Sequence, residues 1–148
     1  MQLSKHSRIA KVLAIDDNAG ILFCLRQALT IKGYEVRTTE SFEGIEAVQG
    51  FSPDLIFLDI SLAGKDGREI ARELKGDVRT RHIPIVIVTA YPDADELAKA
   101  AGADGYLSKP FELIELWKTA AKHLKGASSA NEPEALTGRN LAAVASRA

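Results

Sequence analysis

The sequence contains little cysteine, no excess of charge of either sign and no long apolar run. Cys24 is the only cysteine among the 148 residues, so no internal disulfide can form, and a reducing compartment is the simplest fit. Its position in an apolar helical stripe predicts a buried thiol. The 19 Lys and Arg residues against 20 Asp and Glu give a net charge of -1. No basic excess is left to hold a polyphosphate backbone, which argues against nucleic-acid binding.

Targeting and membrane signals are also missing. Residues 1–8 hold no apolar core of a signal peptide, and no run approaches the ~20 apolar residues of a membrane-spanning helix. We therefore expect a cytoplasmic protein without membrane contact. At this length a single domain buries about two thirds of its unfolded surface, so its core needs neither disulfides nor structural zinc.

Residues 54–59 organise the chain, because four consecutive apolar residues there lead to a carboxylate, Asp59. A short apolar run after Pro53 is typical of a strand buried on both faces, and Asp66 with Gly67 predicts a turn into a helix. Asp59 is therefore expected at the carboxyl end of a central strand. In open α/β sheets, ligands bind outside those carboxyl ends, where the strand order reverses.

Short apolar runs alternate with helical spacing along the rest of the chain. Ser41 is the expected N-cap of the second helix, and Pro110 is expected to open the last one. Five strands that alternate with five helices predict an α/β fold: a doubly wound, five-stranded parallel sheet of order 2-1-3-4-5, flavodoxin-like (βα)5. The strands are expected at residues 11–15, 34–39, 54–59, 83–88 and 105–107.

The composition divides the chain into three parts. Residues 1–9 are an N-terminal tail, residues 10–125 form the domain, and residues 126–148, rich in Ala and Ser, are a C-terminal tail or linker. Three apolar residues of this last part are spaced for a short, weak amphipathic helix: Leu136, Leu141 and Val144.

Polar side chains follow four of the five expected strands. Asp16 and Asp17 end the first strand, and Asp59, Thr89 and Lys109 end the third, fourth and fifth. These strands are neighbours in the expected order, so the side chains converge on one pocket. Three carboxylates repel one another unless a cation lies between them, and clustered hard oxygens are the ligands that Mg²⁺ prefers. The residues therefore predict a Mg²⁺ site.

A lysine and a threonine beside that metal suit a phosphoryl group. The ammonium of Lys109 and Mg²⁺ would neutralise its oxygens, and the hydroxyl of Thr89 would bind one of them. Asp59 is the best candidate nucleophile because it ends the central strand, and its attack on phosphorus would form an aspartyl-phosphate.

Taken together, these motifs form one specific pattern, and through it residues 10–125 resemble the receiver domain of two-component response regulators. The resemblance implies that Asp59 is the phosphoacceptor. It also implies that Asp17 and Asp59 hold Mg²⁺, helped by Asp16 through water and by the backbone carbonyl of Ser61. The matching motifs are Asp16-Asp17, Asp59 with Gly67 eight residues later, Thr89-Ala90, and Gly105-Tyr106-Leu107-Ser108-Lys109-Pro110-Phe111.

The same resemblance assigns the switching residues. Thr89 and Lys109 would contact the phosphoryl group, Tyr106 would reorient on activation, and the peptide bond between Lys109 and Pro110 would be cis. Ser61 and Tyr91 flank the phosphoryl site at positions that tune hydrolysis in the family, and the bulk of Tyr91 predicts that it partly shields phospho-Asp59 from water.

A partner and an output follow from the resemblance as well. A histidine kinase or a histidine phosphotransfer protein would supply the phosphoryl group, and the surface of the fourth helix, fifth strand and fifth helix would change its affinity for a downstream protein target. A phosphorylation-dependent homodimer is one output that the family allows. Apart from phosphotransfer to itself and autodephosphorylation, no enzyme activity is expected.

One loop departs from the family pattern. Many receivers carry a proline soon after the phosphoacceptor, where this chain has Leu62 and Ala63. The missing proline predicts a less rigid loop, without a change in the chemistry.

Three alternatives share parts of this pattern. A phosphatase of the haloacid dehalogenase type needs a second aspartate two residues after the nucleophile, where this chain has Ser61. A flavodoxin-like cofactor binder needs a phosphate loop rich in Ser, Thr and Gly after the first strand, where the chain has Asp16, Asp17 and Asn18. A degenerate receiver, which binds partners without phosphorylation, conflicts with the intact set of site residues.

Overall fold

The computed structural model describes residues 8–124, so most of the expected N-terminal tail and all of the expected C-terminal tail lie outside the described residues. The strands are β1 (Lys11–Ile15), β2 (Glu35–Thr39), β3 (Leu55–Asp59), β4 (Ser61–Leu62), β5 (Lys65–Asp66), β6 (Ile85–Thr89) and β7 (Gly105–Ser108). The helices are α2 (Ala19–Ile31), α3 (Ile45–Phe51), α4 (Gly67–Gly76), α5 (Ala94–Ala101) and α6 (Leu113–His123).

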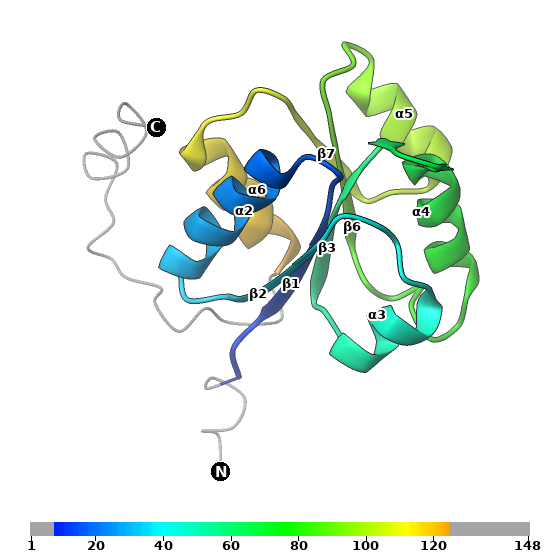
Figure 1. Ribbon diagram of the computed structural model, residues 1–148, viewed down its shortest axis with the longest axis horizontal. Helices are drawn as coiled ribbons and strands as arrows, with labels where there is room; N and C mark the ends of the chain where they lie inside the picture. The colour runs from blue at the N-terminus through cyan, green and yellow to red at the C-terminus, as the bar shows by residue number, and fades with distance from the viewer. Residues whose placement is uncertain (1–7, 125–148) are drawn as a thin grey trace.

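Five strands form a parallel sheet in the order β2-β1-β3-β6-β7. This order confirms the predicted 2-1-3-4-5 arrangement. Helices α2 and α6 cover one face of the sheet and α3, α4 and α5 cover the other (Figure 1). Every residue of β3 and β6 is buried, which explains why both strands are apolar up to their last residue.

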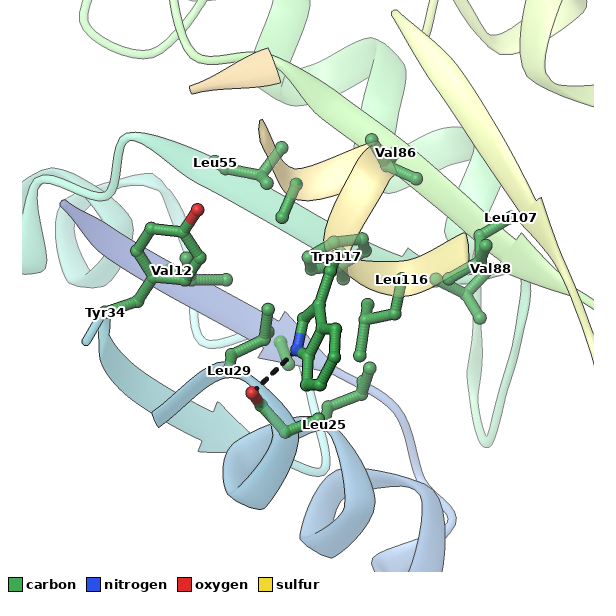
Figure 2. Packing of buried hydrophobic residues seen from close by; sticks show 14 of the residues in the cluster. Val12, Leu25, Leu29, Tyr34, Leu55, Val86, Val88, Leu107, Leu116 and Trp117 are labelled. Carbon is green, nitrogen blue, oxygen red and sulfur yellow. Dashed lines mark hydrogen bonds between the residues drawn. The ribbon is translucent and has the colours of Figure 1, made fainter. Parts of the chain in front are cut away.

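Alternation along the strands divides the core into two halves. Val12 and Ala14 of β1 point into the cluster that α2 and α6 cover, whereas Leu13 and Ile15 point into the cluster under the other helices. Trp117 of α6 lies in the first cluster, where its indole Nε1 donates to the backbone carbonyl of Ala28 in α2 at 2.9 Å (Figure 2). This hydrogen bond joins the two helices that cover one face.

Two expected helix starts are wrong by a few residues. Helix α3 has Gly44, not Ser41, as its N-cap: the carbonyl of Gly44 accepts from the N–H of Val48 at 3.2 Å, whereas the carbonyl of Ser41 accepts from the hydroxyl of Thr39 at 2.9 Å. Helix α6 begins after Glu112, whose capping box with Glu115 satisfies the first turn. The proline expected to open this helix lies two residues before that cap.

Two further observations concern single features of the chain. Cys24 is exposed, so the prediction of a buried thiol is wrong: the helix is apolar on its outer side as well as on its inner side. Among residues 8–124, no helix combines the length and the apolar character that a membrane span requires.

An unexpected hairpin follows the central strand. The short strands β4 and β5 pair antiparallel, with Ser61 opposite Asp66 and Leu62 opposite Lys65. Gly64 makes the turn with a φ of 82°, a backbone conformation that favours glycine. The hairpin therefore stands directly after Asp59, at the carboxyl edge of the sheet.

Candidate functional site

Three carboxylates meet at the carboxyl ends of β1 and β3. Asp16 follows β1 directly and Asp59 is the last residue of β3; they are 2% and 5% exposed, whereas Asp17 is exposed. One oxygen from each of the three lies within 4.8 Å of the other two. The structure therefore brings together the carboxylates that the sequence predicted to converge.

Lys109 follows β7 and reaches across the sheet to these carboxylates. Its Nζ lies 3.0 Å from Oδ2 of Asp16 and 3.4 Å from Oδ1 of Asp59. Its backbone N–H donates to the carbonyl of Thr89 at 2.8 Å, which fixes the loop after β7 to the end of β6. The peptide bond between Lys109 and Pro110 is cis.

Burial and neighbouring charges shift the pKa values of Asp59 and Lys109. Burial, and then repulsion by Asp16, raise the pKa of Asp59, and the ammonium of Lys109 only partly offsets them. For Lys109, burial favours the neutral amine, but the two carboxylates outweigh this effect and raise its pKa. The site thus holds an ammonium ion beside a carboxylate that is costly to ionise.

Local turns hold Asp16 in place. The backbone N–H of Asn18 donates to Oδ1 of Asp16 at 2.9 Å, and the side chain of Asn18 caps α2 by accepting from the N–H of Ile21 at 3.0 Å. Sequence reasoning did not assign this role to Asn18, although an Asp-x-Asn turn before an apolar helix is a recognisable signal.

Thr89 and Tyr91 lie at the end of β6, the strand that pairs with β3 on the side away from β1. Thr89 ends β6 and is 2% exposed, and its hydroxyl accepts from the backbone N–H of Tyr91 at 3.1 Å. The side chain of Tyr91 is half-exposed, and its hydroxyl accepts from that of Ser61 at 3.4 Å. The two residues predicted to tune hydrolysis therefore touch each other.

The hairpin is anchored to the carboxylates, which the sequence did not predict. The backbone N–H of Ala63 donates to Oδ2 of Asp17 at 3.1 Å, so the exposed acid of the cluster also fixes the loop. Strand pairing and this contact hold the loop in which the sequence predicted less rigidity, and that prediction stays a prediction.

Gly67 closes the loop from the other end. Its N–H donates to the carbonyl of Ile60 at 2.8 Å, and a Cβ at this position would collide with the backbone carbonyl of Asp59. The helix that follows can begin so close to the central strand only because residue 67 has no side chain. This gives a physical reason for the glycine eight residues after Asp59.

Tyr106 lies on the edge strand β7 and is 44% exposed, with its side chain on the surface of the molecule. The structure therefore brings Asp16, Asp17 and Lys109 to Asp59. Ser61, Thr89 and Tyr91 follow or end the neighbouring strands β3 and β6, whereas Tyr106 lies on the surface. Tyr106 lies on β7, the strand that pairs with the end of β6 where Thr89 lies. Its outward position is one of the two that a reorienting side chain would need.

The donor set fits a hard divalent cation. Asp16, Asp17 and Asp59 supply only oxygen, which suits Mg²⁺, and the exposure of Asp17 leaves one side of the cluster open for water ligands. No His or Cys contributes to the cluster, so a site built for zinc does not match it.

Comparison with known proteins agrees with this geometry. The sequence profile of the response regulator receiver domain matches residues 12–121, which is most of the chain. The chain belongs to the response regulator receiver family. It is 32% identical over 116 residues to the polar-differentiation response regulator DivK of Brucella ovis, a match that spans 76% of this chain and 94% of that protein.

Solved receiver structures share the fold. The chemotaxis protein CheY4 of Vibrio cholerae superposes with a TM-score of 0.72 at 32% identity, covering 79% of this chain and 100% of CheY4. A response regulator from Chloroflexus aurantiacus superposes with a TM-score of 0.74 at 30% identity, covering 80% of this chain and 99% of that one. This receiver is therefore similar in sequence to nearly all of DivK, and in sequence and fold to nearly all of the solved chain of CheY4.

Proposed function

We propose that this receiver accepts a phosphoryl group on Asp59 from a histidine kinase or a histidine phosphotransfer protein, in a reaction that depends on Mg²⁺. The observation that carries the proposal is the position of Lys109, whose ammonium touches two buried carboxylates at the carboxyl edge of the sheet. A cation held there has a clear use if an anionic phosphoryl group joins Asp59, because the added charge needs neutralisation.

In the transfer step, a carboxylate oxygen of Asp59 attacks phosphorus while the bond from phosphorus to the donor histidine nitrogen breaks. The product is an acyl phosphate on Asp59. Lys109 stays protonated, as its raised pKa favours, and its Nζ neutralises charge on the phosphoryl oxygens. Burial of Asp59 excludes bulk water from the carboxylate during transfer.

The residues that would hold Mg²⁺ are Asp17 and Asp59, with Asp16 acting through water and Ser61 through its backbone carbonyl. When bound, Mg²⁺ neutralises the charge that develops on the phosphoryl oxygens and aligns the group for in-line transfer. The hydrogen bond from Ala63 to Asp17 positions that carboxylate and the hairpin carrying Ser61 on the same side of the site.

The switch would begin at Thr89. In the present state its hydroxyl accepts from the N–H of Tyr91, so movement of Thr89 toward a phosphoryl oxygen also moves the loop before α5. That shift makes room for Tyr106 to turn inward and changes the surface of α5, β7 and α6 that meets the downstream protein target. Phosphorylation then biases an equilibrium between two existing conformations.

The boundaries of the receiver and its cellular compartment are part of the same proposal. Residues 10–125 would form the receiver, and the exchange would occur in the cytoplasm, a reducing compartment that suits the exposed thiol of Cys24. Apart from phosphotransfer to itself and autodephosphorylation, the receiver would catalyse no reaction. A degenerate receiver is disfavoured because Asp16, Asp17, Asp59, Thr89 and Lys109 are all present in the sequence.

The deciding experiment measures phosphorylation by intact mass. The chain is incubated with a small-molecule phosphodonor or with beryllofluoride, with and without Mg²⁺, and Trp117 fluorescence is followed in parallel. Asp59→Asn tests the acceptor. Asp93→Asn is the matched control, because it removes an exposed carboxylate at the same edge of the sheet.

Labelling that requires Mg²⁺, disappears in Asp59→Asn and persists in Asp93→Asn is the expected result. Light scattering of the labelled protein then tests whether phosphorylation drives dimerisation. If the wild type takes no label from any donor, or if Asp59→Asn is labelled equally, Asp59 is not the phosphoacceptor.

A further inference from the structure

Helix α2 exposes two large apolar side chains to the surface. Phe23 is 63% exposed and Ile31 is 59% exposed, and Cys24 and Gln27 are exposed between them. Residues three, four and seven apart share one side of a helix, so these four residues form one surface, the α2 apolar face. Its members are Phe23, Cys24, Gln27 and Ile31.

Charge is nearly absent from this helix. Arg26 is the only charged residue among the 13 residues of α2, whereas α4 carries charged residues in each of its turns. A surface helix of a globular domain ordinarily turns a charged and polar side to water, and exposed large apolar side chains grouped on one helix often mark an interaction surface. The α2 apolar face therefore has the character of a docking surface.

The chain leaves the described fold beside this helix. Leu124, the last described residue, is buried in the same cluster as Leu29 of α2 and Trp117 of α6. The Nζ of Lys32, which caps the carboxyl end of α2, lies 5.1 Å from the centre of the Trp117 ring. Leu124 therefore lies on the face of the sheet that α2 and α6 cover.

The residues that follow are long enough and apolar enough to cover the face. Helix α2 is about 20 Å long at 1.5 Å per residue, and residues 125–135 can extend over up to ~36 Å. Beyond them, residues 140–146 carry no charge, and Leu141 and Val144 are three apart, the spacing of neighbours on one side of a helix. An uncharged segment and an uncharged face match each other in chemistry.

We propose that residues 136–148 dock on the α2 apolar face of the same chain through Leu141 and Val144. The tether keeps the segment at a high effective concentration, so a small apolar contact is enough to hold it. Because α2 begins directly after Asp16 and Asp17, the docked segment would compete with any protein that approaches the phosphoacceptor along this helix. The inference does not depend on phosphorylation.

Cys24 provides a native probe, because it lies on the α2 apolar face and is the only cysteine. The experiment measures the alkylation rate of Cys24 by N-ethylmaleimide in the full unphosphorylated chain without Mg²⁺. The test variant is Leu141→Ser with Val144→Ser. The matched control is Ala127→Ser with Ala130→Ser, which makes two apolar-to-polar changes outside the docking residues.

We expect alkylation about tenfold slower in the wild type and the control than in the test variant, which corresponds to about 1.4 kcal/mol of docking. Trp117 fluorescence should be the same in all three proteins, because no substitution touches the core. The slow rate should not change with protein concentration, and light scattering should give the monomer mass.

Two outcomes would overturn the proposal. Equal alkylation rates in the wild type and the test variant would mean that the face is open and is available to a separate protein. Protection that grows with protein concentration, together with a doubled mass, would identify a second copy as the occupant. Both results leave the phosphorylation of Asp59 untouched, so the two proposals fail separately.

Discussion

The Nζ atom of Lys109 lies 3.4 Å from Oδ1 of Asp59, although 50 residues separate them in the chain. The contact exists because β3 and β7 are parallel and end at the same edge of the sheet, with only β6 between them. The same Nζ lies 3.0 Å from Asp16, so one ammonium neutralises two buried acids. In the proposed reaction Lys109 and Mg²⁺ therefore share one cluster of negative charge.

Replacing Lys109 by Met should destabilise the protein in the absence of Mg²⁺ and make it more dependent on the ion. Asp16 and Asp59 would lose their only ammonium partner among the described residues, at a cost of roughly 1–3 kcal/mol for buried groups left unpaired. Mg²⁺ should restore more stability to the variant than to the wild type, because it meets less competing charge. Thermal unfolding with and without Mg²⁺ measures both effects.

Lys99→Met is the control for that prediction, since Lys99 is mostly exposed and pairs only with Asp95 on its own helix. It should change the melting temperature very little. A loss as large in this control, or a Lys109→Met variant that Mg²⁺ does not rescue, would contradict the assigned role of Lys109.

Asp59→Asn should stabilise the metal-free protein at neutral pH and lose that advantage in acid. Burial and Asp16 raise the pKa of Asp59 in the folded state, so the folded protein pays for ionising this carboxylate whenever the pH lies above the raised value. Below the unfolded value, about 3.9, the group is protonated in both states and the penalty disappears. Asparagine never ionises.

The measurement is the melting temperature of both proteins from pH 7 to pH 4 without Mg²⁺. A gain of about 4 °C at pH 7 corresponds to about 1 kcal/mol for a domain of this size. Asp93→Asn, at an exposed position, should follow the wild type throughout. A variant that is less stable than the wild type at pH 7, or a gain in melting temperature that grows toward pH 4, would show that ionised Asp59 does not destabilise the folded protein.

The predictable part of this molecule is the part that depends on burial and on strand ends. An apolar run of four residues such as 55–58, after Pro53, is typical of a doubly buried strand, and the polar Asp59 at its end is easy to place. Once the order of parallel strands is known, Asp16 and Lys109 must approach Asp59. Fold and site therefore follow from the same pattern.

The features that were missed depend on contacts distant in sequence or on competition between local turns. The hairpin has strands of two residues, too short for any periodicity, and it is held by Asp17 from another strand end. Cys24 follows an apolar spacing that continues onto the exposed side of α2. The cap of α3 is Gly44 and not Ser41, because the carbonyl of Ser41 accepts from the hydroxyl of Thr39 in a local turn.

Gly67→Ala should be strongly destabilising, and Gly50→Ala is its matched control. A Cβ at residue 67 collides with the backbone carbonyl of Asp59, which cannot move without breaking the central strand, so we expect a loss of roughly 2–4 kcal/mol. At residue 50, inside α3, a Cβ meets nothing within 4 Å. There alanine should stabilise by about 0.5–1 kcal/mol, because it favours the helix. Urea unfolding of both variants checks the contrast, and equal effects would contradict the close approach at Gly67.

Tyr91→Ala should accelerate hydrolysis of phospho-Asp59. Hydrolysis requires water to reach phosphorus in line, and Tyr91 stands two residues after Thr89 with its hydroxyl against Ser61, on one side of that approach. Removing the ring opens the approach, and we expect a rate increase of about 3- to 10-fold, which is up to about 1.4 kcal/mol of barrier. The decay of the phosphorylated mass with time measures it.

Tyr91→Phe separates the bulk of the ring from its hydroxyl. It keeps the ring but removes the acceptor of the hydrogen bond from Ser61, and Ser61→Ala removes the donor of the same bond. If the ring shields phosphorus, both variants should hydrolyse at nearly the wild-type rate. If both match Tyr91→Ala instead, the hydrogen bond between Ser61 and Tyr91 controls the approach of water, because the ring stays in Tyr91→Phe and in Ser61→Ala. An unchanged rate in Tyr91→Ala would remove Tyr91 from the reaction altogether and leave its contact with Ser61 as a purely structural link between the hairpin and the end of β6.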